Sequence, residues 1–183
     1  KGIAQFLGIA DLLSEITWNR KNVFGGTGTT NVLIRKAKQI GVYHTHTGEG
    51  YLPGEVVKEG FGDIYKVGAA FVKELQTKGI NALQSWENHL PHDAAAYDRS
   101  RTTAIKFIRE GADAVFDVHR DGVPRREEYI AMVGGQVISQ IRLVVGRQNP
   151  NMNLNDQLAR RIKASADSQF PGLIKGIFYA DGK

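Results

Sequence analysis

The sequence contains no cysteine among its 183 residues. This absence excludes disulfide bonds, thiolate metal ligands and cysteine nucleophiles, but it leaves the compartment open, because many extracytoplasmic bacterial proteins also lack cysteine. No stretch approaches the ~20 consecutive apolar residues of a membrane-spanning helix, and no signal peptide opens the chain. The glycine-rich residues 25–29 lack the Lys-Ser/Thr ending of a phosphate-binding loop, and no serine lies in a Gly-x-Ser-x-Gly setting.

The charge is moderately basic, with 24 basic and 19 acidic residues and a net charge of +5. Short basic clusters are scattered along the chain, which is typical of a solvated surface and also suits an anionic wall polymer. No motif combines aromatic and basic residues as nucleic-acid readers do, so we expect no nucleic-acid partner. A 42% hydrophobic content over this length predicts one globular domain with a full core.

Two regions differ in pattern. Residues 1–30 carry apolar side chains spaced for one short amphipathic helix, and a glycine-rich linker follows it. Residues 31–183 form the main predicted domain. Its first part alternates strand and helix patterns, and the predicted elements are strands at 40–46, 81–86 and 114–119 and helices at 63–78 and 93–109.

The pattern then changes. Two strand-like runs, 128–133 and 137–145, are joined by Gly134-Gly135 and predict a hairpin. A helix at 154–170 and a strand at 173–179 complete the order. This succession predicts the α/β class, with a mostly parallel central sheet, helices on both faces and one antiparallel hairpin.

The candidate chemistry lies at two predicted strand ends. His46 and Glu49 stand in a His-x-x-Glu spacing that a turn can fold onto one metal ion, and His119 follows a distant strand. Ligand sites in open α/β sheets lie beyond the carboxyl ends of strands, so these side chains are expected to meet. Two nearby ligands and a distant histidine are typical of hydrolytic zinc sites.

Some assignments stay open on the residues alone. His44 shares a strand face with His46, so one of the two can instead form a hydrogen bond within the sheet. Asp117 is expected to share the face of His119 or to orient its imidazole from behind. His89 and His92 lie in a proline-containing loop and are interpreted as structural or surface residues.

Five segments in the same order resemble the stage II sporulation protein P family. They are residues 43–53 (YHTHTGEGYLP), 96–101 (AYDRSR), 116–121 (FDVHRD), 143–151 (LVVGRQNPN) and 170–178 (FPGLIKGIF). The resemblance runs from about residue 39 to the end of the chain, whereas residues 1–38 add little to it.

The resemblance implies a zinc-dependent N-acetylmuramoyl-L-alanine amidase with a zinc-peptidase-like α/β fold. Such an enzyme cleaves the amide between muramic acid and the first L-alanine of the peptidoglycan stem peptide. It also implies an extracytoplasmic, membrane-associated role at the septum during engulfment, with stage II sporulation proteins D and M as partners. Membrane attachment would come from a segment outside this chain.

Zinc ligands implied by the resemblance are His46, Glu49 and His119. His44 is an alternative to His46. In some related amidases the carboxylate ligand comes from the start of the following helix, which points to Asp63.

Substrate contacts implied at the same motifs fall on Arg101, Arg120 and Asp121. An arginine there would also suit a zinc carboxypeptidase or endopeptidase acting on the stem peptide, which is the main alternative enzyme. A non-catalytic module that binds wall or partner is the third reading.

Family members continue into a strand with a glutamate that serves as general base in related amidases. This chain ends at Lys183 without an equivalent glutamate, so the catalytic base is unassigned and the domain is expected to lack its last strand and helix. We therefore expect the chain as printed to bind zinc and wall fragments but to hydrolyse them poorly, because losing a general base costs a factor of ~10²–10⁴.

Overall fold

The computed structural model describes residues 39–51, 56–120 and 125–181. The helix and linker predicted for residues 1–30 lie outside these ranges. The predicted α/β class is confirmed, because the chain combines parallel strands, flanking helices and one antiparallel hairpin.

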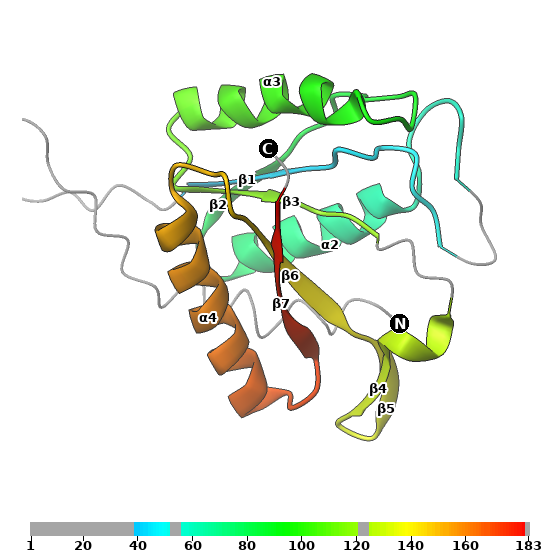
Figure 1. Cartoon of the computed structure of the whole chain (residues 1–183), viewed down its shortest axis with the longest axis vertical. Coiled ribbons are helices and arrows are strands. Elements are labelled where there is room, and N and C mark those ends of the chain that lie inside the picture. Colours follow the sequence, from blue (N-terminus) through cyan, green and yellow to red (C-terminus); the bar gives the residue numbers. More distant parts are fainter. Residues whose placement is uncertain (1–38, 52–55, 121–124, 182–183) are drawn as a thin grey trace, which may run out of the picture.

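A three-stranded parallel sheet forms the first half of the fold (Figure 1). Strand β1 (Gln39–Tyr43) lies between β2 (Asn81–Gln84) and β3 (Ala114–Asp117). Helices α2 (Ile64–Thr77) and α3 (Ala96–Arg109) cover opposite faces of this sheet. The carboxyl ends of the three strands therefore meet at one edge.

All three of these strands end earlier than predicted. The pattern predicted strands to residues 46, 86 and 119, whereas they end at Tyr43, Gln84 and Asp117. The physical reason is visible between β1 and β3, where the amide of Thr45 donates to the carboxylate of Asp117 at 2.9 Å instead of to a backbone carbonyl. A side chain thus takes the place of the backbone hydrogen bonds between the two strands. His44, His46 and His119 consequently lie in loops after the strands.

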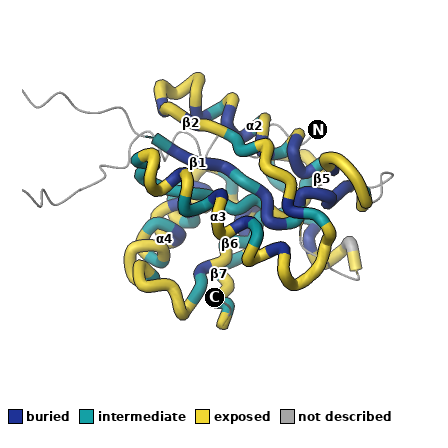
Figure 2. The backbone as a smooth tube through the Cα atoms, turned by 90° about the horizontal axis from the view of Figure 1, so that it is seen from above, coloured by how far each residue is buried: buried dark blue, intermediate teal, exposed yellow. Residues whose placement is uncertain are grey.

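Side-chain alternation along β1 explains how both helices fit. Ile40 and Val42 are fully buried in the cluster that contains Phe71 and Leu75 of α2. Figure 2 shows β1 as a largely buried segment. Gly41 points the other way, and a Cβ built on it would lie 2.5 Å from Cγ of Phe107 in α3. The missing side chain therefore lets α3 approach the sheet closely.

The second half begins with the predicted hairpin. A short 3-10 helix (Arg126–Tyr129) leads into β4 (Ile130–Val133), which pairs antiparallel with β5 (Gln136–Ser139). Gly134 and Gly135 both have positive φ, as a two-residue primed turn requires.

The predicted strand 137–145 is wrong as a single element, because it divides at Gln140. The amide of Gln140 donates to the carbonyl of Tyr129 and its side chain donates to the carbonyl of Gly172. The chain thereby leaves the hairpin and continues as β6 (Ile141–Gly146), which pairs parallel with β7 (Ile174–Ala180). Helix α4 (Met152–Gln169) connects these two strands and packs against both.

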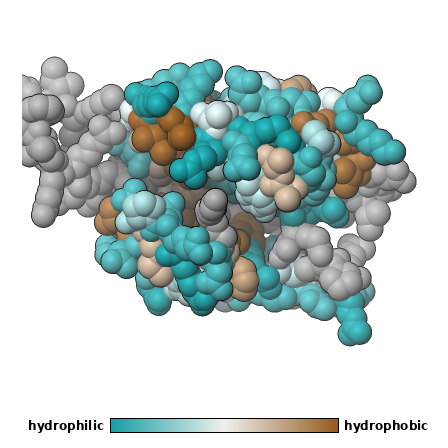
Figure 3. Space-filling model, turned by 45° about the horizontal axis from the view of Figure 1, so that its top comes forward, coloured by the Kyte–Doolittle hydropathy of each residue, from teal (hydrophilic) through white to brown (hydrophobic). Residues whose placement is uncertain are grey.

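One hydrophobic cluster joins the two halves. Ile162 and Ala166 of α4 and Ile174 of β7 belong to the same buried cluster as residues of β1 and α2. The face shown in Figure 3 is mostly hydrophilic, with separate hydrophobic spots. No helix in the described ranges has both the length and the apolar character needed to cross a bilayer.

Substitution Gly41→Ala is expected to lower the free energy of unfolding by about 1–3 kcal/mol, because the new methyl group would overlap Phe107. Urea denaturation measures this change. Gly176→Ala is the matched control, since nothing lies within 4 Å of a Cβ at that position in β7, and its stability should stay within about 0.5 kcal/mol. Equal stabilities for the two variants would contradict the packing argument.

Candidate functional site

A carboxylate connects the ends of β1 and β3. Both oxygens of Asp117 accept hydrogen bonds from Thr45, one from the amide at 2.9 Å and one from the hydroxyl at 2.6 Å. The Thr45 hydroxyl also lies 2.7 Å from the Ser100 hydroxyl on α3. Two strands and one helix are thus fixed at the start of the His-x-x-Glu turn.

The turn itself is held from both sides. The Glu49 amide donates to the carbonyl of His46 at 3.1 Å, and the Thr47 hydroxyl donates to Asn88 at 2.9 Å. Gly62 packs against the turn so closely that any side chain there would collide with the Glu49 carbonyl. The backbone around the predicted ligands is therefore fixed by contacts with two later loops.

Glu49 is almost completely buried, with 4% of its surface exposed. One carboxylate oxygen accepts the backbone amide of Arg120 at 2.6 Å, which draws the segment after β3 against the turn. Burial raises the pKa of Glu49, while the Arg120 amide and the nearby imidazoles of His119 and His92 oppose that shift. The structure therefore places Glu49 next to the segment that carries His119.

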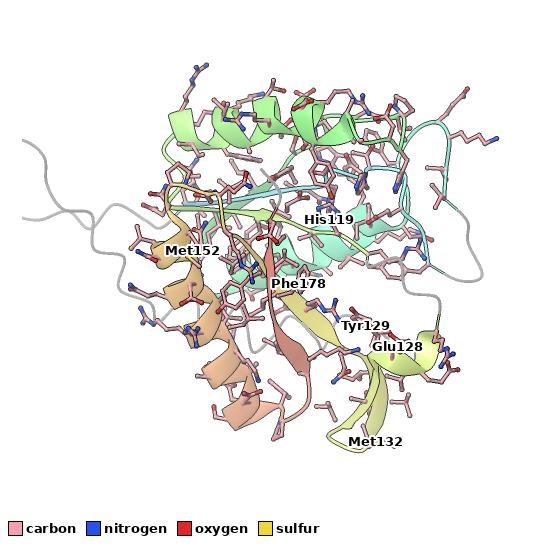
Figure 4. The ribbon with its side chains drawn as sticks, viewed as in Figure 1. His119, Glu128, Tyr129, Met132, Met152 and Phe178 are labelled. Atoms are coloured by element: carbon pink, nitrogen blue, oxygen red, sulfur yellow. The ribbon has the colours of Figure 1, made fainter. Side chains whose placement is uncertain are left out.

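His46 lies among three other rings. Its imidazole stacks on His92 with centroids 4.1 Å apart and meets His119 edge-on at 5.2 Å. Tyr97 of α3 completes the group, also at 5.2 Å and nearly perpendicular to His46. Figure 4 labels His119, which follows β3 in the chain.

The Nδ1 atom of His46 is buried and has no hydrogen-bond partner among the described residues. Burial, and then the neighbouring His92 and His119, lower the pKa of His46 to about 4. The ring is consequently neutral at pH 7, and at least one nitrogen carries a lone pair able to bind a metal. An unsatisfied buried nitrogen is rare in native proteins and calls for an explanation.

His119 is oriented by Asp117. Its Nε2 lies 2.7 Å from an oxygen of that carboxylate. Burial alone would raise the pKa of Asp117, but the hydrogen bonds from His119 and Thr45 outweigh it and lower the pKa. A carboxylate behind an imidazole is the usual support of a metal-binding histidine, and it matches the second role predicted for Asp117.

His44 is a structural histidine in this fold. Its Nδ1 donates to the carbonyl of Val118 at 2.8 Å, and its Nε2 accepts the amide of Gln84 at 2.9 Å. Both nitrogens are therefore used inside the protein, and burial lowers its pKa. Gly68 leaves the room that this ring occupies, because a Cβ there would lie 2.5 Å from Nε2.

The remaining predicted residues are spread more widely. Asp63 is only partly buried and pairs with Lys66 at 2.7 Å, so the buried Glu49 is the better-placed carboxylate. Arg101 is exposed on α3, one turn after Tyr97, and Arg120 contacts the site through its backbone amide. Asp121 lies outside the described residues.

Sequence reasoning missed the place of His92 and Tyr97 in the cluster. The His92 loop is held by Arg99, which donates to the carbonyls of His89 and Pro91 and pairs with Asp93 at 2.7 Å. The resemblance motif at 96–101 contains Tyr97 and Arg99, but nothing in the spacing indicated that this helix faces the histidines.

Zinc fits the donor types present here. Neutral imidazoles and a buried carboxylate are typical zinc ligands, and the unpartnered nitrogen of His46 is consistent with a missing ligand bond. Within the residues that the structure describes, no three His, Asp or Glu side chains converge on a common point for an ion.

In chelator-treated protein, the imidazole of His46 should titrate with a midpoint of about 4, because its pKa is lowered from 6.5 by burial. The folded state then holds fewer protons than the unfolded chain between those pH values, so His46 reduces stability as the pH falls through that window. Nitrogen-15 NMR of the assigned imidazole measures the midpoint. The same resonance in the urea-unfolded chain is the control, and a folded midpoint near 6.5 would contradict the burial argument.

Comparison with known proteins agrees with this arrangement of motifs. The family model of stage II sporulation protein P (SpoIIP) matches residues 16–183. The stage II sporulation protein P of Bacillus subtilis (strain 168) is 28% identical over 157 residues, covering 77% of this chain and 39% of that protein. No solved structure matches significantly. Since the family model covers most of its length, the chain belongs to the stage II sporulation protein P family.

Proposed function

We propose that this chain is the catalytic region of a sporulation peptidoglycan hydrolase, a zinc-dependent N-acetylmuramoyl-L-alanine amidase. The observation that supports it most is the unpartnered buried nitrogen of His46, whose ring meets that of His119, while Glu49 binds the amide of the next residue, Arg120. Membership of the family supports the link to sporulation. The chain spans 39% of the Bacillus subtilis relative, so the activity of the whole protein is part of the proposal.

His46, Glu49 and His119 would hold the zinc ion. When bound, zinc would supply Lewis-acid polarisation of the scissile carbonyl and acidification of water. Asp117 would keep the imidazole of His119 in one orientation through its 2.7 Å contact. The Arg120 amide would keep Glu49 in its ionised form by donating to one of its oxygens.

The exposed rim would hold the substrate. Arg101 and Arg120 are both exposed, and their guanidinium groups suit the carboxylates of a stem peptide. Asp121 is proposed as a third substrate contact. By family resemblance, the protein would act outside the cytoplasm at the septum with stage II sporulation proteins D and M, attached to the membrane through a segment outside this chain.

The test combines zinc content with product analysis. Elemental analysis of this chain should give about one zinc per molecule, and His46→Ala and His119→Ala should each lose it. Lys163→Ala is the matched control, because Lys163 is a surface residue of α4 paired with Asp167 and lies outside the cluster.

Peptidoglycan digestion, on this chain and on the longer native protein, identifies the bond that is cut. An amidase releases intact stem peptides that begin with L-alanine, and mass spectrometry detects them. Shortened peptides would instead favour a carboxypeptidase or endopeptidase. If the longer protein binds zinc but releases nothing, the amidase proposal is wrong and a binding role replaces it.

A further inference from the structure

A group of aromatic rings lies beyond the end of β2. Tyr65 stacks on Trp86 with centroids 5.2 Å apart, and Phe61 meets Tyr65 at 4.4 Å and Trp86 at 5.6 Å. Trp86 is 62% exposed and Phe61 is 44% exposed, whereas Tyr65 is buried beneath them. We call Phe61, Tyr65 and Trp86 the aromatic platform. Ring contacts preorganise it, so its exposed surface is available without rearrangement.

A hollow of about 370 Å³ adjoins the platform between β2 and α3. Apolar and polar side chains share its lining, and the polar ones beside Trp86 include Gln84, Ser85, Glu87 and Lys106. Glu87 and Lys106 are both exposed and 3.9 Å apart, and with Glu110 the hollow offers two carboxylates and one ammonium group for hydrogen bonding.

The platform is continuous with the histidine cluster. The Tyr65 ring lies 4.6 Å from His44, and its hydroxyl donates to the carbonyl of Glu87 at 3.0 Å. The His44 ring in turn accepts a hydrogen bond from the side-chain amide of Gln84. It donates one to the carbonyl of Val118, the residue before His119. Both features therefore lie along the carboxyl edge of the β2-β1-β3 sheet, with the platform at the β2 end.

We propose that the aromatic platform and its hollow form a binding subsite for the glycan strand of the substrate. Pyranose rings present C–H faces that pack on exposed aromatic rings, and their hydroxyl and acetamido groups need polar partners at the edge. The platform supplies the first and the hollow supplies the second. A nucleic acid would require basic groups beside the rings, whereas Glu87 and Glu110 outnumber Lys106 there.

The proposal of this subsite rests on the proposed function in one respect, namely that peptidoglycan is the substrate. Peptide-free oligomers of β-1,4-linked N-acetylglucosamine contain no muramoyl-alanine amide, so their binding is measured separately from hydrolysis. The chain has two tryptophans, and a Trp18→Phe background makes Trp86 the sole one. Adding the hexamer should shift its fluorescence saturably.

Calorimetry then compares variants without relying on that signal. Trp86→Ala should weaken hexamer binding about tenfold or more, because the stacking face is lost, whereas Trp86→Tyr should retain most of the affinity. Phe178→Ala is the matched control, since Phe178 is also an exposed aromatic residue, 51% exposed, but lies on β7 (Figure 4). Circular dichroism checks that each variant is folded.

The outcomes separate the two proposals. Hexamer binding that depends on Trp86 supports the subsite even if no stem peptide is released, and in that case only the amidase proposal fails. Absence of saturable binding, or equal affinity in Trp86→Ala and the parent chain, overturns the subsite even if the enzyme releases stem peptides. Equal weakening by Phe178→Ala would also overturn it.

Discussion

The hydrogen bonds from Thr45 to the carboxylate of Asp117 are the constraint on which the site depends. They end the pairing of β1 and β3, and the segments that follow the two strands leave the sheet next to each other. Three consequences follow from this one contact: the His-x-x-Glu turn begins next to β3, His119 gains a partner behind its ring, and α3 is linked through Ser100. A neutral residue at 117 would leave several donors without an ionised acceptor in a buried place.

Close packing then places the remaining groups. Gly41 lets α3 approach β1. Gly62, before α2, lets its loop approach the turn at Glu49, and Gly68 lets α2 approach His44. Arg99 fixes the loop that stacks His92 on His46. The platform beyond β2 and the histidines beyond β1 and β3 are therefore parts of one edge of the sheet, held by a continuous set of ring contacts and hydrogen bonds.

The sequence predicted what depends on local pattern and on strand order. Alternation of elements indicated the α/β class, and the strand-end motifs indicated that Glu49 and the His119 segment lie near each other, which the hydrogen bond from the Arg120 amide to Glu49 reflects. It did not predict that β1 and β3 end where the Asp117 carboxylate takes a backbone hydrogen bond. Nor did it predict that Gln140 divides the run 137–145 into two strands. The places of His92 and Tyr97 depend on long-range contacts between a loop and a helix, which spacing along the chain does not contain.

The unpartnered nitrogen of His46 has a thermodynamic consequence. Leaving a buried polar atom unsatisfied costs about 1–3 kcal/mol, so His46 is a local source of instability within an otherwise well-bonded edge. Any species that satisfies that atom only in the folded state releases this cost and shifts the folding equilibrium by mass action. A ligand that binds this nitrogen would therefore raise the fraction of folded protein.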